Sequence, residues 1–464
     1  MKKLLLPLTV VSGVLLAAFL YERLFIEHTF GVSAILGVAI LGGFFLFLLL
    51  HYIWRNTPRN ETFVRIWLVG TSTLVSYFVL DLAAGLILIQ PLSPVLVPDQ
   101  FRHHKLVPNS FSKLQQQDFS YVQYVNNLGL RGADTDPKKA PGSYRILTLG
   151  DSFTMGKGVE DDKAWSVLLE KLLNEARPAG CGIGKFQVLN GGVDSYAPIL
   201  SYLQLSRDLA PLQPDMIVLN LDVSDLIQES AYRQQAVVDA NGQIVAVPLG
   251  ERQQSLTDRM RDWIDQHLFF SRALLYYING LFGFADISVR DVVTQANFEI
   301  VAHTLEADQE DRTEQWRRIF ESITRIERYA AEHGIEFVLS VYPWAHQVSD
   351  KEWQPGREIF MPPDAAPSDR NRTIVAAFAA KHGIALADLF PAFRAYDGER
   401  PLYFAHDPHW TETGNEVMAV GLAAELRSRF EPAWCASTAT EHTAAGNTGA
   451  GNTGPASPQA PSRS

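Results

Sequence analysis

The stretch RILTLGDSFTMGKGV, residues 145–159, decides which fold this sequence predicts. An apolar run at 146–149 ends abruptly in a Gly-Asp-Ser turn at 150–152. Short apolar runs bounded by turn residues are typical of strands that are buried on both faces of a parallel sheet. We therefore expect a β-strand here, with Ser152 just beyond its carboxyl end.

Segments typical of helices and of strands alternate after this strand. Further strands are predicted over 186–190, 215–222, 335–343 and 384–389, and helices over 162–176, 197–209, 311–333, 370–383 and 415–430. This alternation predicts an α/β fold in which helices cover both faces of a parallel sheet. We place the domain at 144–435 and expect an irregular, turn-rich lead-in at 91–143.

Residues 226–310 interrupt the alternation and are predicted to form an insertion. A hairpin is expected around Asn241-Gly242, followed by an apolar, aromatic helix over 262–282. Two interpretations of this helix remain open: a subdomain packed on the main core, or a lid or membrane-facing cap over the site. The tail at 436–464 consists mainly of small and polar residues and is expected to be disordered.

Three apolar segments precede the domain, at about 4–21, 31–53 and 66–89. Each is close to the roughly 20 residues that a helix needs to span a bilayer. We expect the first to be a retained anchor, because its flank lacks a small-x-small cleavage site. Lysines and arginines gather before the first segment and between the second and third, which places the amino terminus in the cytoplasm and the domain outside. Asp81, within the third segment, is expected to be reached by water or paired with a helix.

Composition excludes some classes of function. The chain of 464 residues carries a net charge of −11, so no basic face is expected for binding nucleic acid. Two cysteines cannot form a disulfide framework, but one bridge between Cys181 and Cys435 can form.

Polar residues follow several of the predicted strands. Ligands bind beyond the carboxyl ends of the strands in open parallel sheets. A serine hydroxyl is a poor nucleophile unless a histidine takes its proton and an acid orients that histidine. Ser152, His409 and Asp407 are residues of these types at the expected edge. The backbone N–H groups of Ser152 and Gly192 are candidate donors to a developing oxyanion.

Two further details concern loops near this edge. Thr413 and Glu416 predict a capping box for the last helix, which places Asp407 and His409 on the loop before it. His346 also follows a strand and could contact substrate, but we expect a solvent-exposed loop histidine.

The segments LGDSFTMG (149–156), LNGGVDSY (189–196) and HDPHWTETGNEVMA (406–419) resemble those of the SGNH (GDSL-type) hydrolases. The preceding VNNLGLRG (125–132) resembles the lead-in of membrane-anchored members. The resemblance covers about residues 100–430 and implies a flavodoxin-like three-layer α/β/α fold. It also implies esterase or acyl-transfer chemistry, with no metal or cofactor.

Carried over by residue, the resemblance places the nucleophile at Ser152, the oxyanion-hole glycine at Gly192, the base at His409 and the orienting acid at Asp407. One departure concerns the oxyanion hole, because Ser224 stands where the family usually has an asparagine donor. A hydroxyl can donate, but its reach is shorter, and one lost oxyanion donor can cost about 10²–10³ in turnover.

A second departure concerns the acid, which the family often places three residues before the histidine, where this chain has His406. The Asp-x-His-Trp form resembles bacterial polysaccharide O-acetyltransferases and their relatives. The implied topology also packs the first and last helices side by side. Since Cys181 and Cys435 follow these two helices, the resemblance predicts a disulfide between them, which an exported location permits.

The leading hypothesis is an exported serine esterase anchored in the bacterial inner membrane, with its catalytic domain on the periplasmic side. It would act on acyl groups, acetyl among them, of cell-envelope glycans or lipids. A second hypothesis is an O-acyltransferase with the same acyl-enzyme, which would need a membrane-bound acyl-donor protein as partner. A third is a non-catalytic binding or assembly module, which the serine at 224 favours and the complete triad disfavours.

Overall fold

The computed structural model describes residues 10–14, 61–88, 95–177, 181–249, 263–264, 267–271, 299–308 and 310–445. The chain divides into two compact units. One comprises Met1–Leu92 and Gly250–Glu299, and the other comprises Ser93–Leu249 and Ile300–Ser464. The predicted insertion is therefore divided, because its central part groups with the amino-terminal residues and its two ends group with the sheet.

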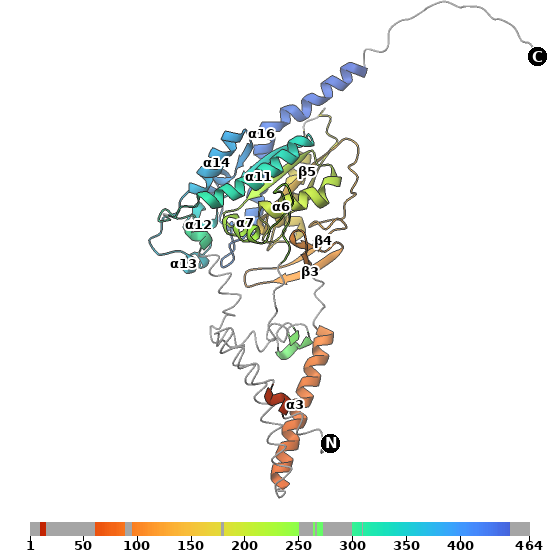
Figure 1. Cartoon of the computed structure of the whole chain (residues 1–464), viewed down its shortest axis with the longest axis vertical. Coiled ribbons are helices and arrows are strands. Elements are labelled where there is room, and N and C mark those ends of the chain that lie inside the picture. The colour runs from red at the N-terminus through yellow and green to blue at the C-terminus, as the bar shows by residue number, and fades with distance from the viewer. Residues whose placement is uncertain are drawn as a thin grey trace, which may run out of the picture. The chain divides into compact units, whose positions relative to one another are not determined.

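A five-stranded parallel sheet forms the centre of the second unit (Figure 1). Its strands are β5 (Ser143–Leu149), β6 (Lys185–Asn190), β7 (Met216–Leu221), β10 (Glu336–Val341) and β11 (Ala385–Asp388). They lie in the order β11-β10-β7-β5-β6. All residues of the central β7 are buried, as expected for a strand with both faces covered. The five predicted strands and the α/β class are confirmed.

Helices cover both faces of this sheet. The longer ones are α5 (Trp165–Glu175), α6 (Pro198–Gln204), α7 (Asp225–Gln234), α11 (Thr313–Glu332), α14 (Arg370–His382) and α16 (Glu412–Ala445). Helix α5 packs against α16, while α6, α7 and α11 pack together. The crossover from β5 to β6 runs opposite to the later ones, so right-handed connections put α5 on the face opposite α6, α11 and α14. The predicted three-layer α/β/α fold is confirmed.

Short elements complete this unit. They are the hairpin β8 (Val237–Val238) and β9 (Ile244–Ala246), the helices α4 (Ser152–Met155), α12 (Ala345–Val348), α13 (Gly356–Phe360) and α15 (Phe390–Arg394), the 3-10 turns Asp161–Lys163 and Ala210–Leu212, and the π-helical turn Leu205–Leu209. The antiparallel β8–β9 pair confirms the hairpin predicted around Asn241-Gly242.

The lead-in is not irregular, contrary to the prediction. It forms two antiparallel hairpins, β1 (Leu96–Asp99) with β2 (His103–Leu106), and β3 (Ser110–Gln115) with β4 (Ser120–Val125). Tyr121, Gln123 and Val125 are buried at alternate positions of β4. This period of two in SYVQYV is typical of a half-buried strand, and it was obscured by the turn residues around it.

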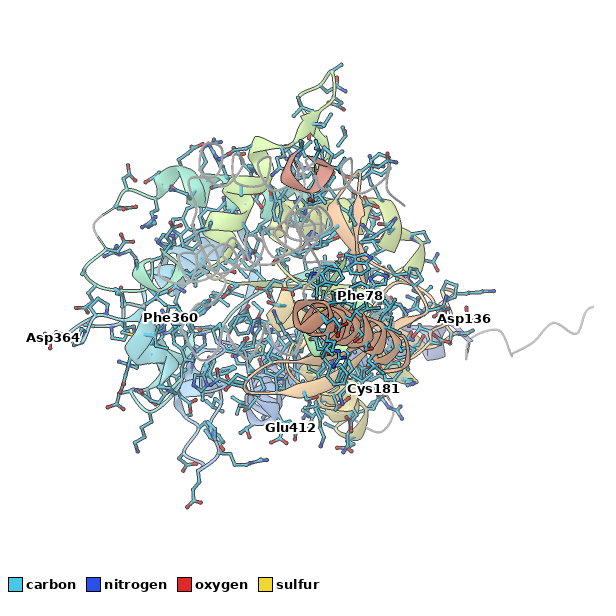
Figure 2. The ribbon with its side chains drawn as sticks, turned by 90° about the horizontal axis from the view of Figure 1, so that it is seen from below. Phe78, Asp136, Cys181, Phe360, Asp364 and Glu412 are labelled. Atoms are coloured by element: carbon cyan, nitrogen blue, oxygen red, sulfur yellow. A yellow bond between two sulfur atoms is a disulfide. The ribbon has the colours of Figure 1, made fainter. Side chains whose placement is uncertain are left out.

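The first unit contains helix α3 (Glu61–Leu88). Its stretch Trp67–Gly85 has a mean hydropathy of 1.4 and is long and apolar enough to cross a membrane. Figure 2 looks along this helix and labels Phe78, whose side chain is 46% exposed. The segment predicted at 66–89 is thus an apolar helix. The segments predicted at 4–21 and 31–53 lie outside the described residues, apart from a helical turn at 10–14.

Asp81 is fully buried in this unit and binds a piece of the insertion. Its carboxylate accepts hydrogen bonds from the backbone N–H of Phe270 (2.5 Å) and from the backbone N–H (3.1 Å) and hydroxyl (2.5 Å) of Ser271. Trp263 stacks on Phe78 with 6.5 Å between ring centroids. The described parts of the segment predicted as a helix at 262–282 therefore contact α3. The rest of that segment lies outside the described residues.

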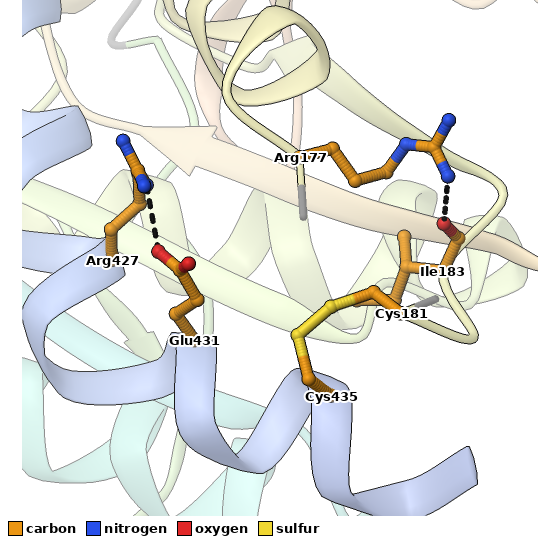
Figure 3. Close-up of a disulfide and its surroundings, with 6 residues drawn as sticks. All are labelled: Arg177, Cys181, Ile183, Arg427, Glu431 and Cys435. Atoms are coloured by element: carbon orange, nitrogen blue, oxygen red, sulfur yellow. Dashed lines mark hydrogen bonds and ion pairs between the residues drawn. A yellow bond between two sulfur atoms is a disulfide. The ribbon is translucent and has the colours of Figure 1, made fainter. Parts of the chain in front are cut away.

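A disulfide joins Cys181, which follows α5, to Cys435 of α16 (Figure 3). The two Cα atoms lie 4.4 Å apart, although 254 positions separate the residues. On the same helix Trp434 packs against Phe186 of β6, with ring centroids 5.0 Å apart. The disulfide therefore joins the segment that follows α5 to α16, on the face of the sheet where these two helices pack together.

The start of α16 differs from the predicted capping box. The helix begins at Glu412, one residue before Thr413, and Glu416 pairs with Arg400 instead of the helix amino terminus. The hydroxyl of Thr411 accepts the N–H of Gly414 at 3.3 Å and serves as the cap. Asp407 and His409 still lie on the loop directly before the helix, as predicted.

Candidate active site

Ser152 is the first residue of α4, immediately after β5 ends. Gly150 has a φ of 147°, and a Cβ there would lie 3.1 Å from the carbonyl oxygen of Asn220, so glycine allows the sharp turn. Asp151 then caps α4 by accepting the N–H of Phe153 at 2.9 Å. These two residues hold Ser152 at the carboxyl edge of the sheet, where it was predicted.

The loop before α16 brings His409 to this serine. Nε2 of His409 lies 2.7 Å from Oγ of Ser152. On the other side of the ring, Nδ1 contacts Oδ1 of Asp407, which also accepts the backbone N–H of His409 at 2.9 Å. An ionised carboxylate only accepts, so we assign the ring proton to Nδ1, which leaves the Nε2 lone pair facing the Ser152 hydroxyl. The geometry is that of a nucleophile, a base and an orienting acid.

The ionisation of Asp407 fits this arrangement. Burial by itself raises the pKa of this carboxyl group. The charge of His409, its hydrogen bonds and the charge of Lys157 together outweigh burial and lower the pKa of Asp407 to about 2. Asp407 is therefore ionised near neutral pH and can stabilise an imidazolium ion on His409.

Aromatic side chains fix the plane of the imidazole. The ring of Phe153 lies 4.6 Å from the ring of His409 and 5.0 Å from that of Trp410. Trp410 is itself buried against Tyr342, at 4.7 Å between ring centroids. Because Phe153 follows Ser152 and Trp410 follows His409 in the chain, the same packing holds Ser152 and His409 together.

The three predicted oxyanion donors differ in their present partners. The N–H of Ser152 has no acceptor among the described residues. The N–H of Gly192 donates to Oδ1 of Asn190 at 3.0 Å, and the carboxyl group of Asp222 accepts the backbone N–H of Ser224 at 3.1 Å and interacts with its hydroxyl. A Cβ at position 192 would lie 2.7 Å from the carbonyl carbon of Thr154, so glycine permits this loop to pass close to α4. Of these three candidate donors, the N–H of Ser152 is therefore the one with no partner among the described residues.

Three buried carboxyl groups lie beneath the site. Burial and mutual repulsion raise the pKa values of Asp151 and Asp225 well above their usual range, and burial raises the pKa of Asp222. Asp222 accepts the indole N–H of Trp344 at 2.6 Å. Oδ1 of Asp225 has no hydrogen-bond partner in the described structure. These shifts favour protonated carboxyl groups in the folded state.

Lys157 is a cation near the site that the sequence did not identify as functional. Its Nζ lies 3.4 Å from Oδ2 of Asp194. Burial lowers the pKa of Lys157, but the charges of Asp194 and Asp407 outweigh this effect and raise it. The only sequence signal is its place between two glycines just after the predicted nucleophile.

The prediction that His346 is solvent-exposed is wrong. The side chain is buried, and its Nε2 lies 2.6 Å from Oγ1 of Thr304. Burial, followed by the charge of Arg357, lowers the pKa of His346 to about 3. His346 lies in α12, shortly after β10, and its side chain is buried in the core, where it contacts Thr304 instead of solvent.

Comparison with known proteins agrees with the fold. Residues 302–455 match the family described as SGNH hydrolase-like domain, acetyltransferase AlgX, a segment that contains Asp407 and His409 but not Ser152. No curated protein is similar enough in sequence to match. In the described part of the chain, no group of three or more His, Cys, Asp or Glu side chains could hold a metal ion.

Solved structures similar to this chain include a putative lipolytic protein of the G-D-S-L family from Desulfitobacterium hafniense, with 11% identity over 61% of this chain and 100% of that one and a TM-score of 0.32. A lipase/acylhydrolase from Enterococcus faecalis has 14% identity over 62% of this chain and 96% of that one, also with a TM-score of 0.32. The family match over residues 302–455 and the three-layer fold together support an SGNH hydrolase-like domain in this chain.

Proposed function

We propose that this chain is a membrane-anchored serine enzyme that cleaves O-acyl esters, acetyl esters foremost, on glycans or lipids of the bacterial cell envelope. The observation that carries the proposal is the 2.7 Å contact between Oγ of Ser152 and Nε2 of His409, with Asp407 on the far side of the ring. The acetyl group is proposed because the matching family is described as an acetyltransferase.

The first half of the reaction forms an acyl-enzyme. Ser152 Oγ attacks the acyl carbonyl carbon while His409 Nε2 takes the hydroxyl proton, and Asp407 stabilises the resulting imidazolium ion. The N–H of Ser152 donates to the oxyanion of the tetrahedral intermediate. When the intermediate collapses, the C–O bond to the alcohol breaks, and His409 returns the proton to that alcohol as it leaves.

The second half releases the acyl group. In the leading proposal His409 takes a proton from water, which attacks the acyl carbonyl and frees Ser152 and a carboxylic acid. A second candidate is transfer, in which a sugar hydroxyl attacks instead of water and a new ester forms. The acetyltransferase description of the family favours this candidate. It needs an acyl donor, which we propose is supplied by a partner protein of the membrane.

The anchoring and its direction are part of the proposal. The support is α3, whose stretch Trp67–Gly85 is apolar enough to cross a bilayer. Together with the distribution of basic residues, this helix supports our proposal of a cytoplasmic amino terminus and a periplasmic catalytic domain. Protease added outside intact spheroplasts should then digest the domain, and a protected domain would contradict this orientation.

The catalytic proposal is tested on the full chain in detergent. A fluorophosphonate probe should label the wild type, and p-nitrophenyl acetate should be hydrolysed, whereas Ser152→Ala and His409→Ala should lose both activities. Ser206→Ala and His333→Ala are matched controls, because the hydrogen bonds described for these side chains go to carbonyl groups within four residues, of Leu203 and Tyr329. A folded wild type that is neither labelled nor active would contradict the proposal and favour a binding or assembly module.

Hydrolysis and transfer can be distinguished by the molecule that accepts the acyl group, which is water in the first case and a glycan hydroxyl in the second. Wild-type protein that has not been treated with the probe is given an acetyl donor ester with and without a non-acetylated glycan. Free acetate formed at the same rate in both supports hydrolysis. Acetylated glycan that depends on Ser152 supports transfer.

A further inference from the structure

We infer that Asp118, from the lead-in, is a positioning residue that holds the catalytic acid and base in place; this inference rests on the proposed function. Asp118 lies in the turn between β3 and β4, which the sequence predicted as an irregular segment. Its side chain is only 9% exposed, although it belongs to a hairpin turn. A buried carboxylate requires compensating partners, and these lie on the loop of Asp407.

Asp118 binds three groups of that loop. Its Oδ2 accepts the backbone N–H of His406 at 2.7 Å and that of Asp407 at 2.8 Å. Its Oδ1 lies 2.8 Å from Nδ1 of the His406 ring. Two consecutive N–H groups thus converge on one carboxylate oxygen, and charge-assisted bonds of this kind are the stronger ones.

The contact fixes Asp407 from both ends. Its backbone N–H is held by Asp118, and its carboxylate is held by the backbone and ring of His409. Pro408 stands between the two catalytic residues, and its ring restricts φ to about −65°. A displacement at Asp407 is therefore transmitted to the His409 ring instead of being absorbed by the link between them.

The preceding residue, His406, is also held on two sides. The N–H of His406 donates to Asp118, while its carbonyl oxygen accepts the indole N–H of Trp353 at 3.2 Å. His406 occupies the position where the family often has its acid, but its ring faces Asp118. This geometry makes His406 a hydrogen-bond partner of Asp118 and leaves the orientation of the His409 ring to Asp407.

The role predicts a specific kinetic signature. In Asp118→Ala the two N–H groups lose their acceptor, and a small displacement of His409 is expected to lower kcat for p-nitrophenyl acetate by about 10- to 100-fold. KM should stay within about twofold, because the displaced groups act on the transition state and not on binding. Asp118→Asn keeps one oxygen that can accept, so it should lose less. Gln116→Ala, an exposed neighbour in the same turn, should match the wild type.

A second measurement does not depend on activity. Hydrogen exchange of the full chain in detergent should show protected amides at His406 and Asp407 in the wild type and in Gln116→Ala. Exchange should be faster in Asp118→Ala, and circular dichroism checks that the variant is folded. If the wild type is neither labelled nor active, the proposed function fails, and the exchange data still decide whether Asp118 holds the loop.

Three outcomes would overturn the inference. They are equal exchange at these amides in Asp118→Ala and wild type, an unchanged kcat in an active enzyme, or a rise in KM that accounts for the whole loss. The last would mean that Asp118 contacts substrate instead of positioning Asp407.

Discussion

Oγ of Ser152 lies 2.7 Å from Nε2 of His409, although 257 positions separate the two residues in the chain. The sheet accounts for this proximity. Ser152 follows β5, while His409 precedes α16, which packs against α5, the helix of the crossover from β5 to β6. Both residues therefore reach the same carboxyl edge of the sheet.

Asp407→Asn should lower kcat for ester hydrolysis by about 10⁴-fold, because an amide can donate to the ring and favour the wrong tautomer of His409. The change is nearly isosteric, so the fold should persist. Steady-state kinetics and fluorophosphonate labelling on the full chain measure the effect, with Asp397→Asn on an exposed loop as control. Wild-type turnover in Asp407→Asn would remove this residue from the triad.

Ser224→Ala should have a small effect, less than about tenfold on kcat, because Ser224 is engaged by Asp222, which accepts its backbone N–H at 3.1 Å and interacts with its hydroxyl. A residue that donates to the oxyanion would cost about 10²–10³. Ser230→Ala, which removes a hydroxyl bonded to the carbonyl of Leu226, is the matched control. A loss of two orders of magnitude specific to Ser224→Ala would establish it as the donor that replaces the family's asparagine.

Asp225 should make stability depend on pH. Its raised pKa means that the folded state retains a proton that the unfolded chain has released above about pH 4, so stability falls as pH rises from there. Asp225→Asn cannot release that proton, and its melting temperature should fall less between pH 4 and 7.

The matched control for this change is Asp364→Asn, since Asp364 is exposed and lies at the periphery in Figure 2. Its melting curve should follow the wild type at every pH. A wild-type pH dependence in Asp225→Asn would show that other groups carry the proton uptake.

The disulfide should stabilise the domain. Cross-links that close long loops contribute about 2–4 kcal/mol. The double variant Cys181→Ala/Cys435→Ala should therefore melt several degrees below the oxidised wild type. Reductant should lower the melting temperature of the wild type and leave the double variant unchanged. Alkylation of both thiols in unreduced wild type would contradict the bridge.

Asp81→Leu should release the described piece of the insertion from α3. The N–H groups of Phe270 and Ser271 would lose a buried acceptor, at a cost of about 1–3 kcal/mol for each unsatisfied group. Hydrogen exchange at 267–271 should become faster in detergent micelles. Leu80→Ala, whose side chain is 64% exposed on the same helix, should not change it. Unchanged exchange in Asp81→Leu would show that this contact does not hold the segment.

The sequence by itself determined the α/β class, the five strands and the positions of Ser152, Asp407 and His409. These follow from local patterns, because short apolar runs and turn residues depend only on neighbours in the chain. The β3–β4 hairpin was missed, since its alternation covers a few residues among many turn-forming ones. The burial of His346 was missed because the sequence does not show which way a side chain points after a strand.

Only the tertiary structure decided which of the candidate oxyanion donors already have hydrogen-bond partners. Gly192 and Ser224 are plausible oxyanion donors by position, but Asn190 and Asp222 engage them. The hydrogen bond from the backbone N–H of Asp407 to Asp118 joins residues 289 positions apart, and no local pattern relates them. Hydrogen bonds between distant segments depend on the packing of the whole domain, so they cannot be predicted from the residues that make them.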